Sequence, residues 1–148
     1  MVKHIPMQAI KKVALVAHDH CKDDLLAWVK ANLAALQEHQ LFATGGTGAR
    51  LERDLGLPIE RLLSGPLGGD QQLGARIAEG GIDVLVFFWD PLEPQPHDPD
   101  VKALLRLAVL YNIPTASNWA TADFLLSSPH FARAYERRLP DHGKRIGR

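Results

Sequence analysis

Short apolar runs alternate with amphipathic segments along this chain, and the alternation narrows the folds that it can adopt. The most apolar run, Val84–Phe88, contains no polar residue, which is typical of a strand covered on both faces. Val13–Ala17 is a second such run, and shorter candidate strands occupy Leu41–Ala43, Ile59–Leu63 and Ile113–Ala116. Strands that alternate with helices favour a parallel sheet between two helical layers. We therefore predict an α/β fold with a mostly parallel five-stranded sheet.

The segments between these strands have the apolar spacing of amphipathic helices. In the first of them, Leu25, Val29, Leu33 and Leu36 follow one another at intervals of 4, 4 and 3 residues. Four further helices are predicted: Ala49–Leu55 ending at Gly56, Asp70–Glu79, a helix with Asp98 as N-cap and Pro99 as its first residue, and Thr121–Leu126.

Length and composition fit an ordinary globular protein. The 148 residues suit one domain spanning 1–148, and 17 basic residues balance 17 acidic ones, so net charge gives no reason to expect nucleic-acid or membrane binding. The single cysteine, Cys21, excludes an internal disulfide and fits a reducing compartment. The first residues contain no apolar run of signal-peptide length. We expect a cytoplasmic protein.

Polar, glycine-rich or ionisable residues follow every predicted strand. Right-handed crossovers place all strand-to-helix loops at one edge of a parallel sheet, which is where ligands bind in open α/β folds. We therefore expect these segments to converge in space: His18–His20, Thr44–Gly48, Ser64–Asp70, Asp90–Asp100 and Ser117–Asn118.

Thr44–Gly48, with the sequence TGGTG, is predicted as a loop between a strand and a helix. Its glycines allow close approach of the backbone to an anion, and its N–H groups and threonine hydroxyls can donate to phosphate oxygens. The loop lacks the Lys-Ser/Thr pair of a Walker A motif, so a flexible turn is the alternative. Ser64–Gly65 is a second, weaker donor site. Lys22 can lend a cation, or it is an ordinary solvated lysine.

Three ionisable residues are candidates for catalysis. Asp70 follows two glycines at a helix start, where it serves either as an N-cap or as a general base that the helix N-terminus keeps ionised. His97 lies among prolines that restrict its backbone, so it is either a positioned imidazole or a surface histidine in a rigid loop. Asp100 can orient His97, contact substrate or complement the helix dipole.

The stretch His18–Cys21 raises the question of a zinc site. A structural zinc site needs four ligands and usually brings a second close pair of His or Cys residues. The chain has no such second pair, so we predict no metal.

Five long stretches, in order along nearly the whole chain, resemble the methylglyoxal synthase family. They are ALVAHDHCK (14–22), ATGGTG (43–48), LSGPLGGDQQLGA (63–75), IDVLVFFWDPLEPQPHDPDVKALLRLA (82–108) and NIPTASNWATADFLLSSPHF (112–131).

The resemblance implies a carbon–oxygen lyase that converts dihydroxyacetone phosphate to methylglyoxal and inorganic phosphate, in a bypass of glycolysis. It implies no metal and no organic cofactor, a homohexamer, and allosteric inhibition by phosphate. The implied fold is a three-layer α/β/α sandwich, which the family shares with a regulatory domain of carbamoyl-phosphate synthetase.

The resemblance also implies roles for individual residues. Asp70 corresponds to the catalytic base, and His97 to a residue that binds and polarises the substrate oxygens. The base removes a C–H proton, the enediolate is stabilised, and phosphate leaves. Asp19 and Asp100 are expected to take part in catalysis and His18 to bind substrate, and all three are expected to line the same pocket. The residues expected to hold the phosphate are Lys22, Thr44, Gly45, Gly46, Thr47, Ser64 and Gly65.

The chain departs from the family pattern at two places. Gly46 stands where the family often has threonine, which removes one hydroxyl donor. Some members place a C-terminal arginine in a neighbouring subunit's site, and Arg145 or Arg148 is the candidate here. The basic tail from about residue 130 is otherwise expected to be a solvated or subunit-facing helix surface.

Three other functions remain open from the residues. A triose phosphate isomerase would use the same base and substrate but retain the phosphate. A phospho-ligand sensor would need the phosphate loop without the combination of Asp70, His97 and Asp100. A metal-dependent phosphatase would need a metal cluster, and chelator sensitivity would reveal it.

Overall fold

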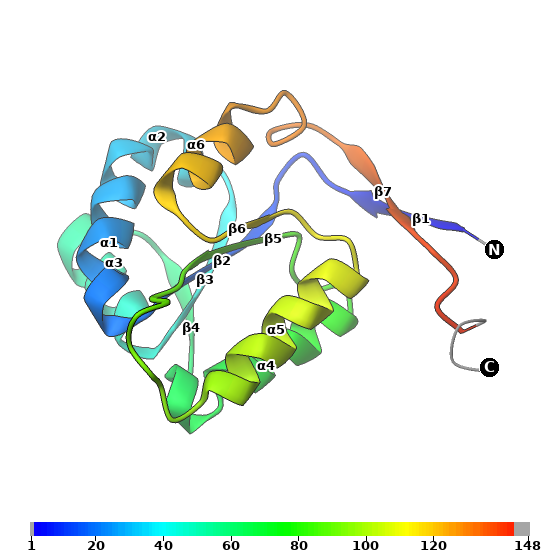
Figure 1. The fold of residues 1–148 in the computed structure, drawn as a ribbon. Coiled ribbons are helices and arrows are strands. Elements are labelled where there is room, and N and C mark those ends of the chain that lie inside the picture. The colour runs from blue at the N-terminus through cyan, green and yellow to red at the C-terminus, as the bar shows by residue number, and fades with distance from the viewer. Residues whose placement is uncertain (1, 144–148) are drawn as a thin grey trace.

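Five parallel strands form the central sheet of the protein (Figure 1). The structure is a computed structural model that describes residues 2–143. The strands lie in the order β4–β3–β2–β5–β6, and every neighbouring pair is parallel. Their bounds are β2 (Lys12–Ala17), β3 (Gln40–Thr44), β4 (Ile59–Leu62), β5 (Val84–Phe88) and β6 (Thr115–Ala116).

Helices cover both faces of this sheet, which confirms the predicted three-layer α/β/α sandwich (Figure 1). One face carries α1 (Lys22–Ala31), α2 (Leu33–Leu36), α3 (Gly45–Leu55) and α6 (Trp119–Ser127); the other carries α4 (Gly69–Ala78) and α5 (Asp98–Leu110). Two 3₁₀ turns, η1 (Asp19–Cys21) and η2 (Gly65–Leu67), lead into α1 and α4.

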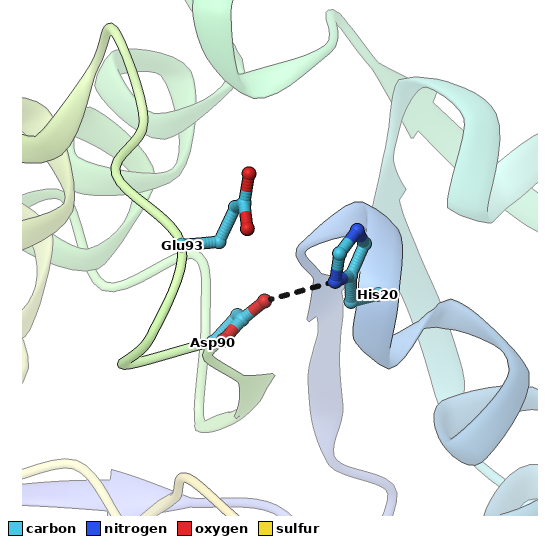
Figure 2. A group of neighbouring side chains, drawn as sticks. All are labelled: His20, Asp90 and Glu93. Carbon is cyan, nitrogen blue, oxygen red and sulfur yellow. Dashed lines mark ion pairs between the residues drawn. The ribbon is translucent and has the colours of Figure 1, made fainter.

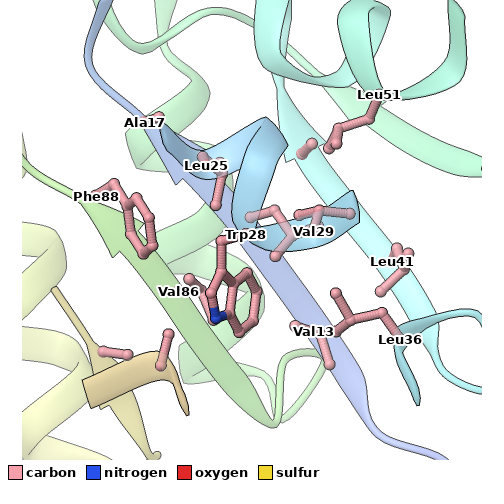
Figure 3. Packing of buried hydrophobic residues seen from close by; sticks show 14 of the residues in the cluster. Val13, Ala17, Leu25, Trp28, Val29, Leu36, Leu41, Leu51, Val86 and Phe88 are labelled. Carbon is pink, nitrogen blue, oxygen red and sulfur yellow. The ribbon is translucent and has the colours of Figure 1, made fainter. Parts of the chain in front are cut away.

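Two apolar cores follow from the alternation of side chains along the strands. In β2, Val13 and Leu15 face the α1 side of the sheet, while Ala14 and Val16 face the α4 side. On the α1 side, the fully buried Trp28 packs beside Phe88 with ring centroids 6.1 Å apart (Figure 3). Burial of each large apolar side chain stabilises the fold by about 1.5–3 kcal/mol.

The first predicted apolar stripe spans two helices rather than one. Asn32 separates α1 from α2 with φ −118° and ψ 23°, outside the helical region. Its side-chain amide donates to the Trp28 carbonyl at 2.8 Å, which satisfies an acceptor at the end of α1. The interruption shifts the later residues around the axis, so Leu36 is fully buried while Leu33 is only partly buried.

The glycine-rich segment after β3 is helical, so the predicted loop over Thr44–Gly48 is wrong. Helix α3 begins at Gly45 and ends at Leu55, and its C-cap Gly56, with φ 66°, matches the predicted glycine stop. Glycine disfavours helix locally, but tertiary packing requires it here. A Cβ on Gly45 would lie 2.7 Å from the Ser64 Cβ, and one on Gly48 would lie 2.8 Å from the Arg61 Cγ.

Two predicted helix starts are shifted by one or two residues. Gly68, with φ 113°, is the N-cap of α4, so Asp70 is the second helical residue and not a cap. His97 is the N-cap of α5, and Asp98 is its first residue. The Asp98 carboxylate accepts the Gln95 N–H at 3.1 Å, a local turn that competes with capping.

A second sheet of two antiparallel strands, β1 (Lys3–Met7) and β7 (Tyr135–Leu139), joins the two ends of the chain (Figure 1). The predicted helix surface in the basic tail is therefore wrong over these residues. Arg137 is buried in β7, where it donates to the Tyr111 carbonyl at 2.8 Å. Because the two strands lie far apart in the sequence, no apolar pattern among neighbouring residues indicates that they pair. Arg145 and Arg148 lie outside the described residues.

None of the helices within residues 2–143 has the length and apolar character needed to cross a membrane.

Candidate active site

A cavity of about 90 Å³ opens at the carboxyl ends of the central strands. The cavity lies at the ends of the neighbouring strands β2 and β5. The chain continues from β2 to a helix on one face of the sheet and from β5 to a helix on the other face, and ligands usually bind at such a point in open α/β folds. A single buried water needs about 10–15 Å³ on this scale, so the cavity admits a small molecule. Of the residues within 2–143 that the resemblance gave a catalytic or binding role, all line this cavity except Gly45 and Asp100. Ser117 and Asn118, which were also expected at this edge, do not line it.

Asp70 and His97 face each other inside the cavity. The two side chains are buried, and His97 Nε2 lies 3.8 Å from Asp70 Oδ2, too far for a hydrogen bond. Oδ2 of Asp70 and Nδ1 of His97 have no hydrogen-bond partner among the described residues. Burial raises the pKa of Asp70, and the nearby Asp100 adds to this effect while His97 opposes it. The pair thus combines the Asp70 carboxylate, which is more basic than usual, with the His97 imidazole, which can polarise a substrate oxygen.

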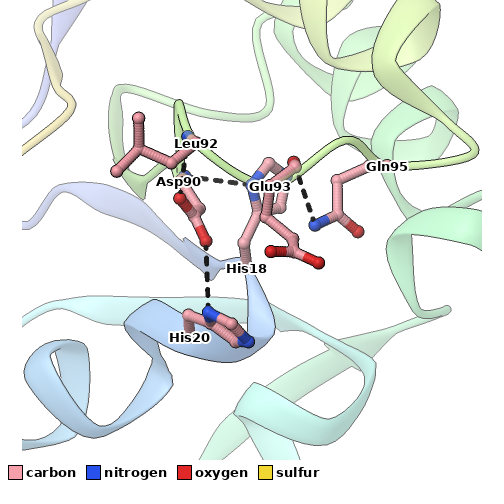
Figure 4. A network of polar contacts seen from close by, with 6 residues as sticks. All are labelled: His18, His20, Asp90, Leu92, Glu93 and Gln95. Atoms are coloured by element: carbon pink, nitrogen blue, oxygen red, sulfur yellow. Dashed lines mark hydrogen bonds and ion pairs between the residues drawn. The ribbon is translucent and has the colours of Figure 1, made fainter.

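His18 presents a hydrogen-bond donor to the same cavity. Its Nδ1 accepts the backbone N–H of Asp90 at 3.1 Å, so in the neutral imidazole the hydrogen is carried by Nε2 (Figure 4). Nε2 is buried and has no partner among the described residues. Burial is the main cause of a lowered pKa for His18, with His97 second. The ring packs edge-on against His97, with centroids 5.7 Å apart.

The opposite wall carries donors suited to an anion. Thr47 Oγ1 is buried without a partner among the described residues, and the first turn of α3 leaves backbone N–H groups unpaired within the helix. Lys22 Nζ lies 2.9 Å from Asp19 Oδ1, and this hydrogen bond is the main cause of a lowered pKa for Asp19. A Cβ on Gly46 would come within 3.1 Å of Lys22 Nζ, so glycine here leaves space for the ammonium.

Gly65 allows His97 to lie close to the loop that carries Ser64. A Cβ at this position would lie 2.7 Å from His97 Nε2 and 3.5 Å from Asp70 Oδ1. The glycine therefore permits the imidazole to reach the loop that carries Ser64. Gly45 does not line the cavity, but it packs against Ser64, which does.

Asp100 lies behind Asp70 and does not line the main cavity. It is half-buried and borders a shallow hollow between α4 and α5 that Asp70 also reaches. Its backbone N–H donates to the His97 carbonyl at 2.9 Å. Asp100 thus supports His97 and raises the pKa of Asp70 from outside the cavity.

Three residues at the site lie in segments that the sequence placed at this edge, but the sequence predicted no role for any of them individually. Asp90 fixes the His18 ring through its backbone N–H, while Pro66 and Gln95 line the cavity. Asp90 closely follows the carboxyl end of β5, so it could have been found, like His18, from the expectation that ligands bind beyond the carboxyl ends of parallel strands.

The stretch His18–Cys21 does not gather into one metal site. His18 points into the cavity, Cys21 is a free thiol, and Asp19 pairs with Lys22. Within residues 2–143, the ligand atoms of His20, Asp90 and Glu93 come close enough together for a metal, and none of these residues lines the cavity (Figure 2).

Comparison with known proteins gives consistent matches. Residues 24–117 match the family described as MGS-like domain. The chain is 59% identical over 146 residues to the methylglyoxal synthase of Cellvibrio japonicus, covering 99% of this chain and 95% of that protein. It is 53% identical over 145 residues to the methylglyoxal synthase of Leptospira interrogans, covering 98% of both. The crystal structure of methylglyoxal synthase from Elizabethkingia anophelis superposes with a TM-score of 0.92 at 51% identity, covering 100% of this chain and 96% of that one.

Proposed function

The chain belongs to the methylglyoxal synthase family, and on that premise we propose that it converts dihydroxyacetone phosphate to methylglyoxal and inorganic phosphate in the cavity at the β2–β5 strand ends. The observation that carries this proposal is the set of buried atoms without a partner among the described residues in one small cavity: Asp70 Oδ2, His97 Nδ1, His18 Nε2 and Thr47 Oγ1. Buried polar atoms normally have partners, so four such atoms gathered around one cavity support the binding of a polar ligand there.

Asp70 is the general base of the proposed reaction. Its carboxylate removes a C–H proton from the hydroxymethyl carbon beside the substrate ketone. The raised pKa supports this role, because a more basic carboxylate accepts a carbon-bound proton more readily. Oδ2 makes no hydrogen bond within the described residues, so a proton arriving there displaces no existing contact.

His97 and His18 stabilise the enediolate that proton removal creates. His18 is held as an Nε2–H donor by the Asp90 N–H at its other nitrogen, and a neutral donor suits a developing oxyanion. His97 Nε2 lies close to the Asp70 carboxylate, so both can reach adjacent atoms of one small substrate.

The phosphate group binds on the side of Lys22, Thr47 and the start of α3. A helix N-terminus, hydroxyl groups and an ammonium together suit a phosphate dianion. Thr44, Gly46, Ser64 and Gly65 complete this wall. Asp19 is paired with Lys22, so phosphate competes with Asp19 for the ammonium.

Elimination distinguishes this reaction from isomerisation. The enediolate expels phosphate when the C–O bond stands roughly perpendicular to its plane, and the enol that remains becomes methylglyoxal by moving its hydroxyl proton, through solvent, to the carbon that carried the phosphate. An isomerase instead keeps the C–O bond in the plane and retains the phosphate. Donors fixed on α1, α3 and η2 can hold the phosphate in one orientation relative to Asp70 on α4. Family membership supports the eliminating orientation.

Further properties belong to the same proposal. The protein acts as a single catalytic domain in the cytoplasm, assembles as a homohexamer, and is inhibited by inorganic phosphate. Product phosphate would occupy the wall of Lys22 and Thr47, which supports competition with substrate at that wall.

A dual product assay tests the activity. Purified protein is incubated with dihydroxyacetone phosphate and a chelator, and methylglyoxal, trapped as an adduct, is measured together with inorganic phosphate. Equal amounts of both products are expected. Glyceraldehyde 3-phosphate without phosphate release would indicate an isomerase, and saturable phosphate binding without turnover would indicate a sensor. Activity that vanished with chelator and returned with a divalent metal would contradict a reaction carried by these side chains alone.

A further inference from the structure

Three side chains of types that can bind metals come together on the loops after β2 and β5, close in sequence to residues that line the cavity, and we call this place the rim (Figure 2). They are His20 from η1, and Asp90 and Glu93 from the loop after β5. One ligand atom from each residue lies within 4.8 Å of the others. None of the three lines the cavity that holds Asp70 and His97.

From this geometry we propose that His20, Asp90 and Glu93 bind a divalent transition-metal ion, with zinc the best match, at a site separate from the catalytic cavity. One imidazole and two carboxylates are ligand types that zinc accepts, and three protein ligands leave a position for water. The site is not needed for the proposed reaction, which uses no metal.

The distance between His20 and Asp90 suits a shared ion as well as the direct ion pair that a protonated His20 would form. His20 Nδ1 lies 3.6 Å from Asp90 Oδ2, beyond hydrogen-bond range. Zinc–ligand bonds of about 2.0–2.2 Å in a tetrahedron separate neighbouring donor atoms by roughly 3.4 Å. The two atoms are therefore already near the spacing that an ion between them requires.

Asp90 is held in place before any ion arrives. Its Oδ1 accepts the Leu92 N–H at 3.0 Å, which turns Oδ2 toward His20 (Figure 4). Its side chain is only 11% exposed, in contrast to 70% for His20. Outer hydrogen bonds of this kind orient ligands and strengthen metal sites.

Local charge also favours a cation. Asp90 and Glu93 supply two carboxylates, and the nearest lysine along the chain, Lys22, is paired with Asp19. The Glu93 side chain is exposed at the rim, so its carboxylate can turn toward an ion. Hard or borderline divalent cations are attracted to such a group of oxygens and one nitrogen.

The ion would connect two loops that also hold the catalytic cavity. The Asp90 N–H that bonds His18 Nδ1 belongs to the residue that would ligate the metal. Zinc would thereby fix the loop after β5 against η1, and with it the Asp90 N–H that positions His18. On the assumption that the proposed function is right, zinc binding slows turnover reversibly.

Direct binding of Zn²⁺ to the purified full chain tests the site without reference to activity. Isothermal titration calorimetry is expected to give one saturable site. His20→Asn and Glu93→Gln are each expected to weaken binding about tenfold or more, because even outer-shell changes cost 10–100-fold. Both residues are exposed, so their substitution leaves the fold intact, which circular dichroism checks.

Matched controls locate the ion. His4→Asn and Glu79→Gln alter an exposed histidine and an exposed glutamate far from the rim in sequence, and are expected to leave zinc affinity unchanged. Cys21→Ser tests the neighbouring thiol and is expected to have no effect. Undetectable zinc binding, or binding that His20→Asn and Glu93→Gln leave unaltered, would overturn the proposal. If zinc inhibits turnover of the original protein but not of His20→Asn or Glu93→Gln, the result would also support the effect of zinc on catalysis. If the protein binds zinc at this site but has no turnover, the result would count against the proposed function and not against the zinc site.

Discussion

His97 Nε2 lies 3.8 Å from Asp70 Oδ2, close enough for electrostatic interaction and too far for a hydrogen bond. The gap leaves the carboxylate without a hydrogen-bond partner at this oxygen within residues 2–143, although Asp70 is only 2% exposed. A purely structural pair would close this distance, because an unpaired buried carboxylate is costly. The arrangement suits a general base whose carboxylate oxygen is available to accept a proton from the substrate.

Replacing Asp70 with asparagine is expected to abolish most of the turnover. The amide has nearly the same shape but cannot accept the proton, so kcat should fall by about 10²–10⁴-fold. Steady-state kinetics on dihydroxyacetone phosphate would measure the loss. Asp24→Asn, an exposed aspartate on α1, is the control and should keep full activity. Near-full turnover in Asp70→Asn would remove Asp70 from the role of base.

Asp70 is also expected to make the free energy of unfolding depend on pH. Its folded-state pKa is raised above the ordinary 3.8, so between 3.8 and that raised value the folded protein binds more protons than the unfolded chain. The contribution of Asp70 to stability is therefore lost as pH rises through this window. Urea unfolding across the acidic range should show a smaller decline with rising pH in Asp70→Asn. Identical pH profiles would contradict the raised pKa.

A methyl group at Gly65 is expected to impair catalysis more than folding. The added Cβ would lie 2.7 Å from His97 Nε2, so the imidazole must move away from the position that faces Asp70. Misplacement of about 1 Å can cost 10²-fold in rate, and kcat for Gly65→Ala should fall by about that factor.

Gly80→Ala provides the contrast to Gly65→Ala. Gly80 has φ +79°, and a Cβ added there would meet no atom of the described residues within 4 Å, so the change strains the backbone and touches no catalytic group. It should lower the free energy of unfolding by about 1 kcal/mol and leave kcat unchanged. If both variants lost equal activity, displacement of His97 would not be the cause.

Removing the charge of Lys22 is expected to weaken phosphate binding. Lys22→Met keeps most of the length of the side chain but loses the ammonium, so KM for substrate and the inhibition constant for phosphate should both rise, by about 10-fold or more. The exposed Lys30 lies on the same helix, and Lys30→Met is the matched control. A fall in kcat at unchanged KM would place Lys22 in the chemical step instead.

Much of this architecture is visible in local sequence patterns. The apolar run Val84–Phe88 and the stripe that begins at Leu25 predict strand and helix because burial imposes a period on the sequence. The candidate site followed from one further rule, that loops after parallel strands share an edge. This rule brought His18, Asp70 and His97 to one cavity from segments far apart in the chain.

Local patterns failed where distant contacts override propensity. The glycines at the start of α3 favour a loop by themselves, yet the close approach of Ser64 and Arg61 requires them within a helix. Strands β1 and β7 pair across almost the whole length of the chain, so neither β1 nor the burial of Arg137 could be inferred from neighbouring residues.

Local sequence patterns are enough to predict the α/β architecture and the residue types at the strand ends, because periodic burial and chain topology follow from local order. How those residues meet is visible only in the folded domain: the Asp90 N–H fixes His18 as a donor, Asp100 lies behind Asp70, and His20 faces Asp90 and Glu93 at the rim. These relationships depend on distances between side chains from different loops, and such distances are set by the packing of the whole domain.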